Sequence, residues 1–359
     1  MTNTVNPEMV RLAREARGLT QTGLAKAARL NQATISKIES SLLDVSPANL
    51  TAIAGAVKMP ETFFYQTDLI HGAGTSEFFH RKRQAVPVGV LMKIHALINI
   101  LRIQIATLLH AVEPPPCQIP QLELADFNGN PAEVARAVRA ALNVSAGPIP
   151  TVVKLIEDAG GLVIPCAFGT FEVDAISRWV PGMPMPLFFV NSAAPVDRFR
   201  MNIAHELGHM VMHRVPEADM EDQANKFAAE FLMPASEIKP QLYNITLQRL
   251  AALKPYWRTS MNSILKRAGD LNTVSSGALR YLWIQMAQRG YRKREPQELD
   301  LIPEPPSLLK EIVDFYRMDL GYSVDDLARA LKSTSADLMV MYGLELSKPE
   351  TARQLRRVK

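Results

Sequence analysis

Apolar residues recur every three to four positions along most of the chain, which predicts a largely helical protein. Short helices separated by polar turns are expected over residues 8–64. The longest apolar segment covers residues 86–112. Lys93, His95 and Arg102 interrupt it, and such charges are costly at the centre of a bilayer. We therefore expect a long packed helix there and no membrane span.

Three short stretches depart from the helical period. Residues 162–165, 174–179 and 187–190 are rich in branched or aromatic side chains, which predicts strands joined by turns. A helix is expected to begin near Val196, and another to cover residues 220–232. The fold class predicted from these elements is mostly α with a small β-sheet.

Proline-rich stretches at residues 114–116 and 303–306 cannot continue a helix and mark breaks in the chain. With the patterns between them, they predict four units. The first is a five-helix domain, and the second is a helical linker that includes Arg81, Lys82 and Arg83. The third is an α+β domain and the fourth is a helical C-terminal region. Their expected bounds are 8–70, 81–116, 130–270 and 271–359.

Composition limits the class of protein. A chain of 359 residues that is 47% hydrophobic can bury two or three cores without disulfide support. Cys117 and Cys166 fit neither a disulfide framework nor a cysteine zinc knuckle, and the first seven residues lack the basic start and apolar core of a secretory signal. A cytoplasmic protein is expected. The net charge of +4 permits nucleic-acid binding without requiring it.

A candidate metal motif, AHELGHMVMH, covers residues 204–213. Positions i and i+4 share one face of a helix, so His205 and His209 can offer both imidazoles to a single ion. Glu206 lies beside them and can reach a metal-bound water without ligating the metal. In this H-E-x-x-H arrangement, zinc lowers the pKa of its water to about 7 and the glutamate takes the proton as the water attacks an amide carbonyl.

A catalytic zinc needs one more protein ligand, and nearby histidines do not supply it. His213 is two turns beyond His205, about 12 Å along the helix axis, which is too far for both to bind one ion. The extended motif with a third histidine would need glycine and histidine where the chain has Met212 and Val215. That variant of the motif is excluded.

Glu221, on the next helix, is the better candidate for the third ligand. The run EDQAN places Glu221 and Asn225 one turn apart on one face, so that Asn225 can orient the ligands from behind. Asp222 and Glu230 remain alternatives to Glu221.

Two blocks around this motif, DRFRMNIAHELGH from residue 197 and ANKFAAEFLMP from residue 224, resemble the ImmA/IrrE family of metallopeptidases. The resemblance implies a minimal zincin-like core and, in several members, cleavage of a repressor. Matched position by position, it makes His205 and His209 the histidine ligands, Glu206 the catalytic glutamate and Glu221 the glutamate ligand. Residues 174–177 and 189–191 fit the strands before the motif, where an exposed edge strand can hold an extended peptide by strand addition.

A second motif lies in the first unit, where RGLTQTGLAKAA is followed by NQATISKIE. Leu24, Ala25 and Ala28 give one helix a small apolar face, and Ile35 and Ile38 point inward from the next. This arrangement resembles the Cro and lambda-repressor helix-turn-helix of the XRE class.

The resemblance implies that the second helix enters the major groove of a double-stranded DNA operator. The candidates for contact with phosphate, at the start of the first helix, and with base edges, on the second, are Gln21, Thr22, Gln32, Thr34, Ser36 and Lys37. Acidic and basic residues are equal in number before residue 81, so non-specific affinity should be weak and salt-sensitive. A homodimer paired through the helix at 86–112 would double the contacts.

Two functions of different classes follow. The leading hypothesis is a cytoplasmic regulator that binds its operator as a dimer and couples regulation to zinc-dependent hydrolysis of a repressor-like protein or of the chain itself. The alternative is a transcriptional repressor or antitoxin whose zinc domain senses a ligand and cleaves nothing. The intact Glu206 favours the first.

Overall fold

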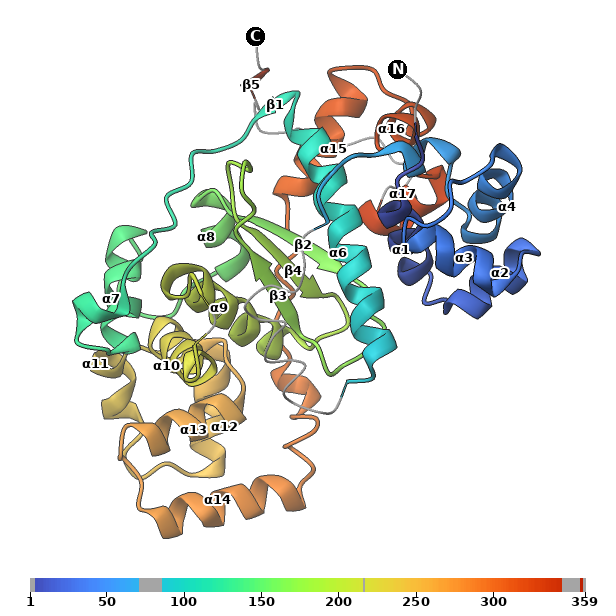
Figure 1. The fold of residues 1–359 in the computed structure, drawn as a ribbon. Helices are drawn as coiled ribbons and strands as arrows, with labels where there is room; N and C mark the ends of the chain where they lie inside the picture. The colour runs from blue at the N-terminus through green and yellow to red at the C-terminus, as the bar shows by residue number, and fades with distance from the viewer. Residues whose placement is uncertain (1–3, 71–85, 216, 344–355, 358–359) are drawn as a thin grey trace.

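The computed structural model describes residues 4–70, 86–215, 217–343 and 356–357. The basic run Arg81, Lys82 and Arg83 lies outside the described residues. The chain is mostly helical around a small three-stranded sheet, as the sequence predicts (Figure 1).

The N-terminal domain is a bundle of short helices, three of which begin at a side-chain cap. Asn6, Thr20 and Ser46 accept hydrogen bonds from main-chain N–H groups in the first turns of α1, α2 and α4, which satisfies donors that the helix leaves unpaired. The fifth element, η1, is a 3-10 helix of five residues. The elements are α1 (Pro7–Ala16), α2 (Gln21–Ala28), α3 (Gln32–Glu39), α4 (Pro47–Val57) and η1 (Glu61–Tyr65).

Helix α6 (Val88–Leu109) lies between the N-terminal domain and the sheet (Figure 1). Ala96, Ile100 and Ile103 pack into the core of the N-terminal domain, whereas Ile94 and Ile98 belong to a second core beneath the sheet. Among the described residues it alone is long and apolar enough to cross a membrane, and 61% of its apolar window is buried inside the chain. The segment expected as a linker therefore buries most of its apolar window within the chain.

The sheet has three strands, β2 (Leu162–Cys166), β4 (Leu187–Asn191) and β3 (Ala175–Arg178), in that spatial order. β2 runs parallel to the central β4, and β3 pairs antiparallel with β4 at the edge. Successive side chains point to opposite faces, so Phe188 enters one core and Phe189 the other. All three strands appear where the sequence predicts them.

The larger core lies between the sheet and a group of helices that surround α9 (Val196–Met212) and α10 (Met220–Leu232). The other elements of this unit are η2 (Leu124–Phe127), α7 (Pro131–Ala141), α8 (Val152–Asp158), α11 (Ala235–Ile238), η3 (Lys239–Gln241), α12 (Leu247–Trp257), α13 (Met261–Asp270), α14 (Ser276–Gln288) and η4 (Gln297–Leu299).

The C-terminal region divides into two parts that pack in different places. α14 contributes Leu282 and Met286 to the larger core, whereas α15 (Leu308–Met318), α16 (Val324–Ala330) and α17 (Ser335–Tyr342) join α6 and the sheet in the second core. β5 (Arg356–Arg357) pairs antiparallel with β1 (Val112–Glu113). The expected single C-terminal unit is thus shared between two cores.

The proline-rich stretch before α15 is fixed to the domain by two carboxylates. Glu304 accepts hydrogen bonds from the main-chain N–H groups of Val152 and Val153 at the start of α8. Glu157 of α8 accepts in turn from Ser307 and Leu308 at the start of α15. Each segment therefore caps the helix of the other, which holds α15 against the sheet.

Candidate metal centre

The motif helix α9 has one face in the larger core and another turned toward α10. Ile203, Ala204 and Leu207 are fully buried in that core. His205 and His209 share the other face, one turn apart, as the motif requires.

Gly208 sets how closely α9 and α10 approach. A Cβ atom at this position would lie 3.0 Å from Cδ1 and 3.1 Å from Cγ of Phe227 on α10, so a larger residue would push the ring away. Because the two helices are in contact here, the first turn of α10 brings Glu221 opposite the two histidines.

His205, His209 and Glu221 form one cluster whose ligand atoms all lie within 4.8 Å of one another. His209 Nε2 is 3.0 Å from His205 Nε2 and 3.2 Å from Glu221 Oε1, and His205 Nε2 is 3.6 Å from Glu221 Oε2. Tetrahedral zinc with bonds of about 2.0–2.2 Å would hold two ligand atoms roughly 3.3–3.6 Å apart. The two imidazoles and the carboxylate therefore fit one zinc ion in both chemistry and spacing.

Glu206 lies on the sheet side of this cluster and is held by the edge strand. Ser177 of β3 donates its hydroxyl to Glu206 Oε2 at 2.5 Å and to the main-chain oxygen of Glu206 at 3.3 Å. Glu206 is only 4% exposed. The sequence placed residues 174–177 before the motif but did not identify this contact, since nothing in a strand pattern shows which hydroxyl meets which helix.

The other two acids proposed as third ligands face elsewhere. Asp222 is exposed and pairs with Lys226 at 2.7 Å. Glu230 is buried, where Arg136 donates to it at 3.1 Å and Arg267 and the main-chain N–H of Ala235 also donate to it. Of the three candidate acids, Glu221 is the one that lies with the histidines.

His213 and Gln223 lie beside the proposed ligands, a position that the sequence did not indicate. His213 Nδ1 lies 2.9 Å from His209 Nδ1, and His213 Nε2 lies 2.7 Å from Gln223 Oε1. Burial lowers the pKa of His213 to about 4, so this ring is neutral at physiological pH. Asn225, expected behind the ligands, is half-buried, and no hydrogen bond joins it to the cluster within the described residues.

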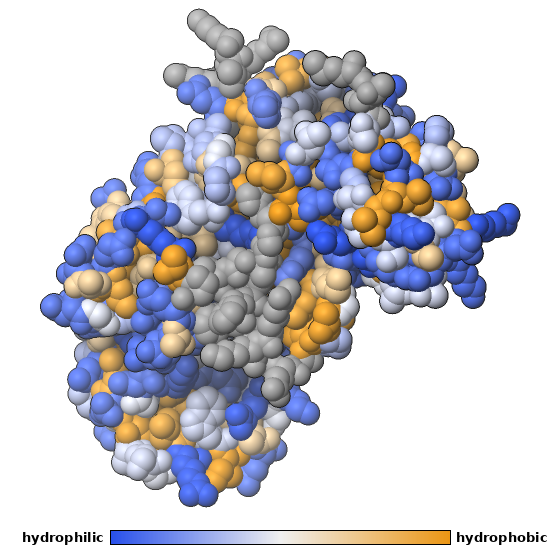
Figure 2. All heavy atoms as spheres, viewed as in Figure 1, coloured by the Kyte–Doolittle hydropathy of each residue, from blue (hydrophilic) through white to orange (hydrophobic). Residues whose placement is uncertain are grey.

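The candidate DNA-binding residues lie on α2 and α3. Thr22, Gln32 and Lys37 are exposed, whereas Gln21, Thr34 and Ser36 are half-buried. Polar side chains predominate over the edge of the N-terminal domain where these helices lie (Figure 2). The exposed start of α3 is therefore available for contact with a groove.

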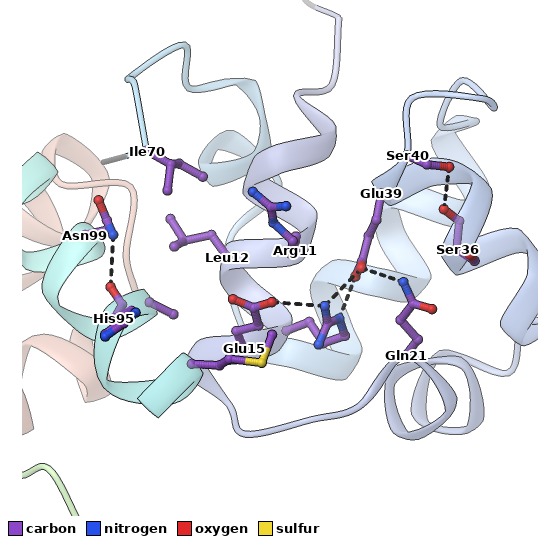
Figure 3. Close-up of a pocket in the computed structure, with 13 residues that line it drawn as sticks. Arg11, Leu12, Glu15, Gln21, Ser36, Glu39, Ser40, Ile70, His95 and Asn99 are labelled. Atoms are coloured by element: carbon purple, nitrogen blue, oxygen red, sulfur yellow. Dashed lines mark hydrogen bonds and ion pairs between the residues drawn. The ribbon is translucent and has the colours of Figure 1, made fainter. Parts of the chain in front are cut away.

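A buried ion pair fixes α3 to α1. Arg14 Nε donates to Glu39 Oε1 at 2.6 Å, and Gln21 donates to Glu39 Oε2 at 2.9 Å (Figure 3). Gln32 in turn donates to Gln21 at 3.0 Å. The feature of the sequence that could have indicated this ion pair is Arg14, because it is a charged residue on the otherwise apolar buried face of α1.

A cavity of about 470 Å³ opens where α1, α3 and α6 meet (Figure 3). Ser36 and Ser40 line it from α3, and His95 and Asn99 line it from α6. Ser36 thus lies beside this cavity rather than on the outermost face of α3.

Two families match parts of the chain. Residues 156–268 match the IrrE N-terminal-like domain, and residues 10–64 match a helix-turn-helix family. The first range contains the histidine and glutamate cluster, and the second contains α2 and α3. No curated protein matches the chain.

Proposed function

For a chain that fuses an XRE-type helix-turn-helix to an IrrE N-terminal-like domain, we propose a DNA-binding regulator whose second domain is a zinc-dependent endopeptidase. The observation that carries the proposal is the cluster of His205, His209 and Glu221 with Glu206 beside it. The proposed substrate is a repressor-like protein or the chain itself. We further propose that the protein acts in the cytoplasm as a homodimer.

Each side chain of the centre has a distinct part in this proposal. His205, His209 and Glu221 would hold zinc, which would supply Lewis-acid activation of water and of the scissile carbonyl. Glu206 takes a proton on its carboxylate from the attacking water, and Ser177 holds that carboxylate in place. β3 lies at the edge of the described sheet, but all four of its residues are buried, so it is not the exposed edge strand that strand addition requires.

One observation favours a second candidate function, a regulator whose zinc domain senses a ligand. Glu206 is almost wholly buried and its carboxylate is already bound by Ser177. A base in this position needs room for water and peptide before it can act. The sensor and the peptidase differ in whether loss of the Glu206 carboxylate changes regulation.

We expect Glu221→Ala to lose most of its bound zinc, because two imidazoles alone complete only half of a tetrahedral site. Zinc per chain is measured by atomic emission after dialysis. Asp222→Ala is the matched control, since that carboxylate is one residue away but pairs with Lys226 at the surface. Equal zinc contents in the two variants would remove Glu221 from the ligand set.

The helix-turn-helix is tested by gel shift with an operator selected from random duplexes. Gln32→Ala should weaken binding to the selected operator by about 1–3 kcal/mol, as expected for loss of a base contact. Lys37→Ala should weaken binding to all sequences and reduce the salt slope by about 1. Lys154→Ala, exposed on α8, serves as the control. Wild-type affinity in both α3 variants would refute the assignment of the recognition helix.

A further inference from the structure

The centre contains a histidine that the proposed mechanism does not use. His213 follows His209 by one turn of α9 and is 7% exposed, and His209 itself is fully buried. Gln223 reaches His213 from the first turn of α10, two residues after Glu221. The side chains of His209, His213 and Gln223 thus form a continuous hydrogen-bonded row.

The row uses the side of His209 that faces away from the ligand cluster. His209 Nε2 faces Glu221 and His205, while its Nδ1 lies 2.9 Å from His213 Nδ1. A zinc-binding imidazole is neutral and binds through the nitrogen that lacks a proton. The proton of His209 must therefore be on Nδ1 for Nε2 to bind the ion.

Gln223 determines which way the protons run along the row. Its Oε1, 2.7 Å from His213 Nε2, can only accept a hydrogen bond, so His213 donates from Nε2. His213 Nδ1 then accepts the N–H of His209 Nδ1. This order leaves the lone pair of His209 Nε2 directed at the cluster.

We propose that His213 and Gln223 are positioning residues that fix the tautomer and ring orientation of His209 for zinc. The inference rests on the proposed zinc centre and assigns these residues no contact with the ion. The row contributes a defined direction of hydrogen bonding at His209, rather than bulk alone. Partners of this kind typically change metal affinity by about 10–100-fold when they are lost.

The test is a zinc titration of the full-length chain against a chelator of known affinity. His213→Ala and Gln223→Leu should each raise the dissociation constant for zinc about 10–100-fold. His213→Asn keeps an acceptor for the N–H of His209, and Gln223→Glu keeps one for the N–H of His213, so each should recover most of the affinity. Met212→Leu is the control for packing, because Met212 is buried beside His213. The d–d spectrum of the Co²⁺-loaded chain should change in His213→Ala and Gln223→Leu and stay unchanged in Met212→Leu.

The outcomes separate this inference from the function on which it rests. If the wild type binds zinc and both His213→Ala and Gln223→Leu bind it equally well, the positioning role is overturned alone. If His213→Asn and Gln223→Glu bind zinc as weakly as His213→Ala and Gln223→Leu, the two side chains act through packing and the inference also fails. A wild type that binds no zinc would overturn the proposed metal centre together with the inference. Circular dichroism of each variant, followed through urea unfolding, reports that the domain around α9 and α10 is folded.

Discussion

Glu206→Gln is expected to lower the rate of zinc-dependent peptide hydrolysis by about 10²–10⁴-fold, because an amide cannot take a proton from the attacking water. Zinc binding should be retained, since Glu206 lies outside the ligand cluster. The side-chain oxygen of glutamine can still accept the hydroxyl of Ser177. The measurement is the appearance of cleavage products of the candidate repressor or of the chain itself, followed by electrophoresis and mass spectrometry.

Glu217→Gln is the matched control, because this glutamate is exposed on the segment between α9 and α10. The Glu217→Gln variant should cleave at the wild-type rate. The same two variants also separate the two candidate functions in cells. If Glu206→Gln binds zinc and operator normally and leaves the regulatory response unchanged, the peptidase hypothesis fails and the ligand sensor stands.

Lys254→Met should destabilise the domain that carries the metal centre by about 3–5 kcal/mol, the usual cost of removing one partner from a buried ionic group. Lys254 is 1% exposed and donates to Asp197 Oδ2 at 2.6 Å and to Glu295 Oε2 at 2.7 Å. Burial opposes its charge, but the two carboxylates outweigh burial and raise the pKa of Lys254. Without this cation, two carboxylates are left in a buried site.

The effect should reach the metal centre, because Asp197 lies in the first turn of α9. Urea unfolding followed by circular dichroism gives the change in unfolding free energy, measured with and without zinc. Lys154→Met is the control, since Lys154 forms an exposed pair with Asp158 on α8 and should cost no more than about 0.5 kcal/mol. Similar losses of unfolding free energy in the two variants would show that the buried contacts of Lys254 contribute no more to stability than an exposed ion pair.

Much of the centre could be predicted because its determinants are local. The i, i+4 spacing of His205 and His209 holds in any α-helix, whatever surrounds it. Likewise, the polar caps and apolar spacing of the first 64 residues indicate the short helices that the structure contains. The three strands follow from short branched and aromatic runs for the same reason.

The remaining features depend on contacts between segments far apart in the chain. Ser177 meets Glu206 because β3 packs against α9, and Arg267 reaches Glu230 of α10 from α13. Glu230 remains an alternative to Glu221 as a zinc ligand until these partners are known. α6 is the clearest case, because a long apolar helix fits a linker, a dimer interface or a core equally well by composition.

The sequence by itself identified the H-E-x-x-H motif, with His205, Glu206 and His209 on one helix, and the helix-turn-helix ahead of it. Only the tertiary structure decided which acid lies with the histidines, since the close packing of α9 on α10 at Gly208 brings Glu221 into reach. It also decided that His213, excluded as a ligand by its distance from His205, lies behind His209. The physical reason is that periodicity fixes the face of a helix, whereas the partner of that face is chosen by packing.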